Sequence, residues 1–123
     1  MNRLIISQQA LPIAALVVSV TSVASPRAQE NCRPIRFAPG HSAVTVQGIA
    51  PPDDAVCYSF AAGAGQTARL KVTGTNMIVS VIGIGDARDS WTFTTRAQAY
   101  KFVVGQLMRS VTPEPYTVTL SIR

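Results

Sequence analysis

Apolar and polar side chains alternate along most of the chain after position 43, and glycine, proline or aspartate interrupts the alternation every few residues. A period of two places successive side chains on opposite faces of a β-strand, whereas a helix needs apolar residues three or four positions apart. The pattern is clearest at 116–122, where every second residue is aromatic or aliphatic. Further alternating segments lie at 44–47, 56–60, 68–72, 91–96 and 100–104. No long segment has helical spacing, so the sequence predicts an all-β fold.

One segment does not alternate. Met77–Ile84 is a nearly continuous apolar run rich in β-branched residues, which is typical of a central strand covered on both faces. Periodicity alone leaves a short buried helix open, although Gly83 and Gly85 favour the strand. The polar residues that follow, 85–90, are expected to form a loop. With the alternating segments, this pattern predicts an antiparallel β-sandwich of about seven to eight strands around one core.

Composition is consistent with a single folded unit. The chain has 123 residues, of which 47% are hydrophobic and 14% are charged. This length suits one domain, and so apolar a chain is not typical of a disordered protein. The scarcity of charged residues also argues against a coiled coil.

The first 28 residues have the layout of a secretory signal peptide. Arg3 precedes an apolar stretch without acidic residues, and small residues follow, so cleavage is expected after Ala24 or Ala28. A retained anchor is the alternative, but the Leu11–Val20 run is shorter than the roughly 20 apolar residues that a membrane span needs. We therefore expect a periplasmic or secreted protein without membrane insertion, in which residues 29–123 form a single β-sandwich domain.

The exported part contains two cysteines, Cys32 and Cys57. In an oxidising compartment, an isolated pair of cysteines most simply forms one disulfide bond. This bond would tie the N-terminal segment to an early strand. Two free thiols that bind a metal are the alternative, but they lack partners because His41 is the sole histidine of the sequence.

Charge and motifs argue against nucleic-acid binding and against catalysis. Removal of residues 1–28 would leave nine basic and six acidic residues, a net charge of +3 without a basic stripe. Such a mild charge would favour an acidic protein partner. No nucleophile elbow, P-loop or dinucleotide fingerprint occurs, and the aspartates at 53, 54, 86 and 89 fit turns better than a calcium loop. We therefore expect no cofactor, no metal site and no enzymatic activity.

Two groups of residues resemble a known family. They are the segments 36–43 (RFAPGHSA) and 58–66 (YSFAAGAGQ), together with Gly48 and Asn76. These residues resemble the periplasmic inhibitors of goose-type lysozyme, small secreted β-sandwiches related in shape to bacterial pre-peptidase C-terminal domains. Tyr100, Val104 and Gln106 continue the similarity, which covers residues 35–123.

The chain departs from the family pattern at several positions. The family has an Arg-rich stretch just after the glutamine that corresponds to Gln106, whereas this chain has the single Arg109 within 106–110. Ala99 stands where a glycine is expected. The cysteine pair is not a family hallmark.

The resemblance implies a protein that blocks a lysozyme cleft with a rigid basic loop. Such a cleft carries catalytic carboxylates, and an arginine guanidinium can bond a carboxylate through two parallel hydrogen bonds. The candidate loop is 106–115, in which Arg109 would pair with a carboxylate while Gln106 and Ser110 supply further hydrogen bonds. Arg88 is expected beside this loop. The alternative is that Arg109 and Arg88 are ordinary solvated charges.

A second function stays open at this point. A sandwich of the pre-peptidase C-terminal type would be a non-catalytic envelope module that binds a glycan or a peptide. An exposed aromatic platform would serve a sugar, and Trp91, Tyr58 and Tyr100 are the candidates. Each of them occupies the inward phase of its strand, however, which favours a place in the core.

Overall fold

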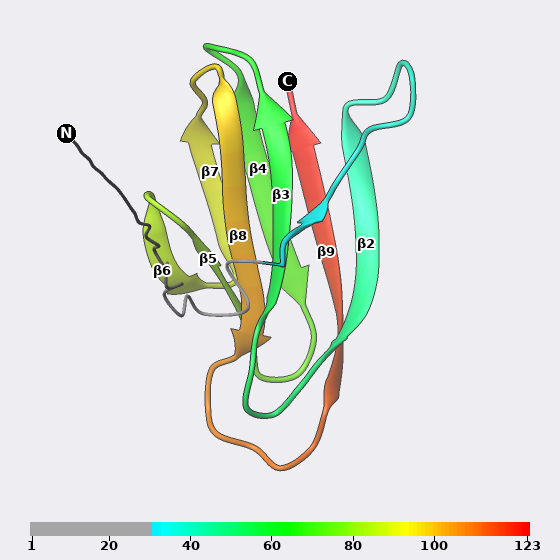
Figure 1. Ribbon diagram of the computed structural model, residues 1–123, viewed down its shortest axis with the longest axis vertical. Coiled ribbons are helices and arrows are strands. Elements are labelled where there is room, and N and C mark those ends of the chain that lie inside the picture. Colours follow the sequence, from blue (N-terminus) through cyan, green and yellow to red (C-terminus); the bar gives the residue numbers. More distant parts are fainter. Residues whose placement is uncertain (1–30) are drawn as a thin grey trace, which may run out of the picture.

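The computed structural model describes residues 31–123, which form nine β-strands and contain no α-helix (Figure 1). The strands are β1 (Arg33–Pro34), β2 (Ala43–Ala50), β3 (Val56–Ala62), β4 (Thr67–Thr73), β5 (Met77–Val81), β6 (Gly85–Arg88), β7 (Ser90–Thr94), β8 (Gln98–Gln106) and β9 (Glu114–Ile122). Within this range there is thus no apolar helix of membrane-spanning length. The expected signal peptide, residues 1–28, lies outside the described residues.

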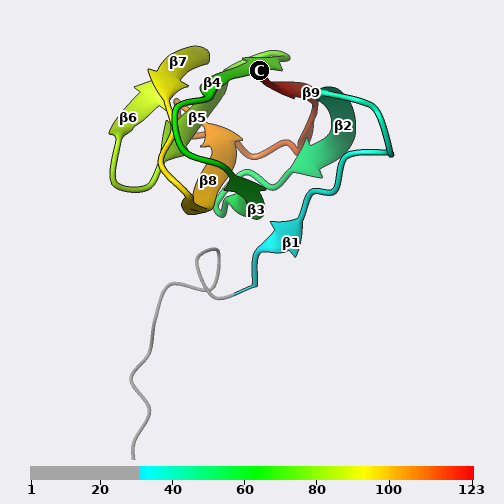
Figure 2. The same cartoon turned by 90° about the horizontal axis from the view of Figure 1, so that it is seen from above.

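The strands form two sheets that pack face to face (Figure 2). One sheet has five strands in the order β1-β3-β8-β5-β6, and the other has four in the order β2-β9-β4-β7. All neighbouring strands are antiparallel except β1, which runs parallel to β3. The predicted all-β antiparallel sandwich is therefore confirmed.

The alternating residues supply the core between the sheets. In β9 every second residue from Tyr116 to Ile122 is buried, and β4 follows the same pattern. On the inner face of the five-stranded sheet, the rings of the cross-strand partners Tyr58 and Phe102 stack at 5.3 Å and those of Phe60 and Tyr100 at 5.5 Å. Full burial of one large apolar side chain contributes about 1.5–3 kcal/mol, so these facing rows are the main source of stability.

Tyr58 and Tyr116 join the two sheets through a polar contact inside this core. Their hydroxyl oxygens lie 2.5 Å apart, Tyr58 on β3 and Tyr116 on β9. Burial raises the pKa of Tyr116 above its ordinary 10.0, and the hydrogen bond and charge of Tyr58 act in the same direction, while Arg33 opposes them weakly. Gly48 of β2 leaves room for this ring, since a Cβ there would lie 2.4 Å from the Tyr116 hydroxyl.

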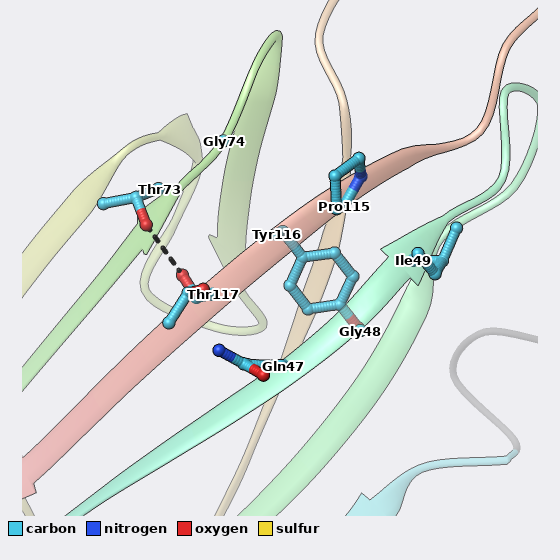
Figure 3. A pocket seen from close by; sticks show the side chains of 8 residues that line it. All are labelled: Gln47, Gly48, Ile49, Thr73, Gly74, Pro115, Tyr116 and Thr117. Atoms are coloured by element: carbon cyan, nitrogen blue, oxygen red, sulfur yellow. Dashed lines mark hydrogen bonds between the residues drawn. The ribbon is translucent and has the colours of Figure 1, made fainter.

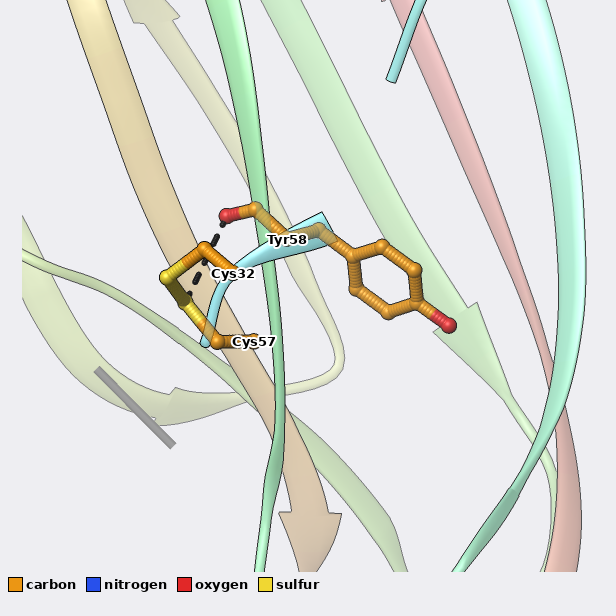
Figure 4. The surroundings of a disulfide bond; sticks show 3 residues. All are labelled: Cys32, Cys57 and Tyr58. Carbon is orange, nitrogen blue, oxygen red and sulfur yellow. Dashed lines mark hydrogen bonds between the residues drawn. A yellow bond between two sulfur atoms is a disulfide. The ribbon is translucent and has the colours of Figure 1, made fainter. Parts of the chain in front are cut away.

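The disulfide bond holds the N-terminal strand on the sandwich (Figure 4). Cys32 and Cys57 are bonded with their Cα atoms 4.4 Å apart, which confirms the predicted pairing. Arg33 and Pro34 pair with Tyr58 and Ser59, and the Ile35 amide donates to the Ser59 carbonyl at 2.7 Å. The cross-link keeps the two-residue strand β1 beside β3. In the chain-entropy model, closing a loop between residues 25 positions apart stabilises the folded state by about 3 kcal/mol.

Two local predictions were wrong. Residues 85–88, expected in a loop, form β6 because β5 has a free side where a strand can pair, and polarity does not prevent edge pairing. The run Met77–Ile84 is not covered on both faces: the strand ends at Val81, and Ile82 and Ile84 are exposed. No further layer of the described chain covers the outer face of the five-stranded sheet, so Ile78 stays half-buried.

Gly48→Ala should destabilise the fold by about 1–3 kcal/mol, because the added methyl group would overlap the buried Tyr116 ring. Urea unfolding followed by tryptophan fluorescence measures this loss. Gly63→Ala is the matched control, since a Cβ at Gly63 meets nothing closer than 3.4 Å. Equal midpoints for Gly48→Ala and wild type would contradict the packing described here.

Stability should also fall in alkaline solution. The unfolded chain releases the Tyr116 proton near the ordinary pKa of 10.0, while the folded chain keeps it to higher pH. The neutral phenol therefore stabilises the fold fully below pH 10, and the free energy of unfolding should decline above it by up to about 1.4 kcal/mol per pH unit. Urea titrations from pH 8 to 11 measure the slope, and Tyr116→Phe should show a shallower decline from a lower starting stability. An equal slope in both proteins would refute this cause.

Candidate functional site

Three loops meet at one end of the sandwich (Figure 1). They are the connection of β2 to β3 (51–55), that of β4 to β5 (74–76) and that of β8 to β9 (107–113). We call this region the loop end. The candidate loop 106–115 lies here, although its first residue ends β8 and its last two belong to β9.

Gln106 connects two of these loops with the end of β2. Its Nε2 atom donates to the Ala50 carbonyl at 3.2 Å and to the Thr112 carbonyl at 2.9 Å. Its Oε1 atom accepts a hydrogen bond from Asn76 Nδ2 at 3.2 Å. Both ends of the Gln106 amide therefore have partners inside the protein.

Asn76 fixes the start of the β8–β9 loop. Its side chain accepts from the Met108 amide and donates to the Met108 carbonyl, each at 2.9 Å, and its own carbonyl accepts from the Leu107 amide at 2.9 Å. Asn76 has a φ of 61°, a left-handed conformation that asparagine tolerates better than most residues. We call Gln106 and Asn76 together the amide clamp.

Ser110 closes a local turn further along the loop. Its hydroxyl donates to the Thr112 carbonyl at 3.2 Å and accepts from the Thr112 amide at 3.0 Å. Such side-chain-to-backbone bonds are the usual way in which serine shapes a turn. With the amide clamp, this turn holds the loop through its own polar groups.

The loop offers a cation and apolar side chains to solvent. Arg109 is exposed and, within residues 31–123, makes no ion pair; it lines a surface hollow of about 390 Å³ with Pro52, Asp53, Ser110 and Val111. The same loop exposes 59% of Leu107, 67% of Met108 and 93% of Val111. Exposed apolar groups gathered on one loop are typical of a contact surface.

Arg88 lies elsewhere in the fold. It ends β6, the edge strand that β5 separates from β8, and it lies opposite Val79 of β5. Its guanidinium carbon lies 4.8 Å from the centre of the Trp91 ring, a cation–π contact. The structure thus brings Gln106, Arg109 and Ser110 together on one end and gives Arg88 a separate partner.

The three aromatic residues considered for a sugar platform are not free to form one. Tyr58 and Tyr100 are 2% and 5% exposed, respectively. Trp91 is half-buried, and its Nε1 atom donates to the Val79 carbonyl at 2.9 Å. Residues 31–123 also contain no group of three or more His, Cys, Asp or Glu side chains placed to hold a metal ion.

Sequence reasoning missed two features of the loop end. The sequence marks Asn76 only as part of the family resemblance, although its position after Gly74 and Thr75 could have indicated a left-handed turn residue. The exposure of Leu107, Met108 and Val111 was not predicted, because the sequence does not show whether an apolar residue of a loop is buried or exposed.

The chain has the fold of a small β-sandwich, and this fold is similar to that of periplasmic inhibitors of g-type lysozyme. Aeromonas hydrophila PliG, such an inhibitor, is 22% identical with a TM-score of 0.63, covering 75% of this chain and 96% of its own. Salmonella Typhimurium PliG is 20% identical with a TM-score of 0.61, and a mutant of Escherichia coli PliG is 21% identical with a TM-score of 0.60. Both alignments cover 73% of this chain and 96% of the inhibitor.

These likenesses confirm the resemblance found in the sequence at the level of the fold. No protein-family model matches the chain, and no curated protein matches it in sequence. The three PliG proteins are inhibitors of an enzyme, and they are periplasmic. A disulfide bond in this chain is consistent with a location outside the cytoplasm.

Asn76→Ala should release the loop. The variant loses the three side-chain hydrogen bonds of the clamp and places alanine in a left-handed conformation, a loss of about 2–3 kcal/mol in the free energy of unfolding. Hydrogen exchange of the Met108 amide should accelerate, as NMR can measure. Asn76→Gly separates the two causes because it keeps the backbone conformation, and Thr75→Ala is the neutral control. Unchanged Met108 exchange in Asn76→Gly would show that the side chain does not hold the loop.

Proposed function

We propose that this protein is a non-enzymatic inhibitor that blocks the cleft of a lysozyme, in particular a goose-type lysozyme, with its β8–β9 loop. The observation that carries the proposal is the loop end itself. Its polar groups are held within the protein, while Arg109 extends from it without an ion-pair partner among residues 31–123. The fold shared with the PliG inhibitors supports the same reading.

The proposed contact combines charge with apolar packing. A lysozyme cleft presents carboxylates, and Arg109 can bond one of them bidentately as water leaves. Leu107, Met108 and Val111 surround Arg109 in the sequence and would pack on the cleft wall, the type of anchor that dominates binding energy. A loop that is already ordered loses little conformational entropy on binding.

Gln106 and Ser110 take a different part in this proposal from the one expected from the sequence. Their polar atoms already bond Ala50, Thr112 and Asn76, so a hydrogen bond to an enzyme would compete with these contacts. We propose that they position Arg109 instead of touching the partner. Arg88, held over Trp91, would contribute only if the partner extended around the five-stranded sheet.

The proposal places the protein in the periplasm or outside the cell, where the disulfide bond would persist and where a lysozyme would be met. The alternative of a glycan-binding module with an aromatic platform gains no support from the positions of Tyr58, Tyr100 and Trp91. The leading function therefore depends on the loop and not on the aromatic residues.

Arg109→Ala should weaken inhibition roughly 30-fold or more without changing stability, because it removes one partner of a buried charge pair in the complex. The measurement is the clearing of bacterial cell-wall suspensions by goose-type lysozyme at increasing inhibitor concentration. Lys101→Ala removes the same charge from the exposed face of β8 and is the matched control. If Arg109→Ala inhibits as well as wild type, Arg109 is a solvated charge and the assignment fails.

A further inference from the structure

The outer face of the four-stranded sheet has an unusual composition. The side chains on this face alternate with those of the core and belong to Ala43, Thr45, Gln47 and Ile49 of β2, Pro115, Thr117, Thr119 and Ser121 of β9, Thr67, Arg69, Lys71 and Thr73 of β4, and Ser90, Thr92 and Thr94 of β7. Hydroxyl groups dominate, two side chains are cationic and none is a carboxylate. No other element of the described chain covers this face.

Two hollows lie over β9, one near each end of the strand. The first, of about 540 Å³, lies near the loop end and is lined by Gln47, Gly48, Ile49, Thr73, Gly74, Pro115, Tyr116 and Thr117 (Figure 3). The second, of about 410 Å³, is lined by Thr67, Arg69, Ser121 and Arg123. Thr117 and Ser121 are four residues apart on one strand, about 14 Å. We call the strip of the outer face that holds both hollows, formed by β9 and the adjoining residues of β2 and β4, the β9 trough.

The cations of the trough have no internal partner. Arg69 and Lys71 point from the same face of β4, about 7 Å apart along the strand. In the part of the chain described, neither forms an ion pair, and the outer face holds no side-chain carboxylate to neutralise them. Arg123 adds a third cation. Its amide donates to the Thr67 carbonyl and its carbonyl accepts from the Thr67 amide, so Arg123 lies beside the end of β4. Like charges that are not neutralised create a positive field along the trough.

The chemistry of the trough selects among ligands. Arginine bonds carboxylates, sulfates or phosphates bidentately, lysine contributes a point charge, and the hydroxyls of Thr117, Thr119 and Ser121 can exchange hydrogen bonds with sugar hydroxyls. A neutral sugar would lack the aromatic surface on which it usually stacks. An extended acidic peptide would lack backbone partners, because β9 and β4 each already pair with strands on both sides.

We propose that the β9 trough binds a linear anionic polysaccharide, laid along β9, with its acidic groups on Arg69 and Lys71. The cationic part of the trough is separate from the site proposed for lysozyme, although the first hollow borders the loop end. β9 begins at the loop end, and Arg69 pairs with Ser121 near its other end, about 20 Å away. The proposal does not depend on lysozyme inhibition.

The test measures binding of the exported chain to immobilised polygalacturonate, with neutral dextran as a reference surface. The double variant Arg69→Gln/Lys71→Gln should bind about tenfold more weakly, the combined loss of two exposed charge pairs. Wild-type binding should weaken as salt rises from 20 to about 150 mM, where the Debye length is near 8 Å. Thermal unfolding checks that the variants are folded.

The matched control is Arg36→Gln/Lys101→Gln, which removes the same charge from exposed positions outside the trough. It should bind within twofold of wild type, and the Arg69/Lys71 variant should still inhibit lysozyme as wild type does if that function holds. If both double variants lost binding equally, net charge alone would explain the binding and the proposal would be overturned. Tighter binding to polyglutamate than to polygalacturonate, or no binding to the latter, would overturn it as well.

Discussion

The two sheets of this protein are joined by a core in which one polar contact is enclosed. Tyr58 and Tyr116 meet through their hydroxyls, and their rings fill the space between β3 and β9. A buried hydroxyl is costly unless it is hydrogen-bonded, so this bond favours the arrangement of the two sheets in which one tyrosine hydroxyl donates to the other. Gly48 is part of this arrangement, because a larger residue would displace the Tyr116 ring. The surfaces at the loop end and on the outer face depend on this arrangement.

The loop end shows how a sandwich can order an exposed loop through its own polar side chains. Two side-chain amides, Gln106 and Asn76, satisfy backbone groups of Ala50, Met108 and Thr112 that would otherwise need water. A single glutamine at the end of β8 thus donates hydrogen bonds to both Ala50 and Thr112. The scaffold therefore orders the loop, so that its exposed side chains would meet the proposed partner without a large loss of conformational entropy.

Strand positions could be predicted well from the sequence, and loops could not. The segments that became β2, β3, β4, β8 and β9 alternate clearly, because one face of each meets the core and the other meets water. β6 was missed because its residues carry no such signal; it is a strand only because β5 offers an edge. Arg109 was recognised as a candidate from its loop, whereas the role of Asn76 requires knowing that residues 30 positions apart meet.

The sequence by itself determined the fold class, the inward residues and the cysteine pair. These follow from local periodicity and from elimination, which need no knowledge of distant contacts. The tertiary structure alone decided which loops converge, which polar groups hold them and which cations remain unpaired. The sequence does not distinguish Arg88 from Arg109, yet Arg88 stacks on Trp91 and Arg109 faces solvent. The difference arises because pairing between strands, and not order along the chain, sets the neighbours of a side chain.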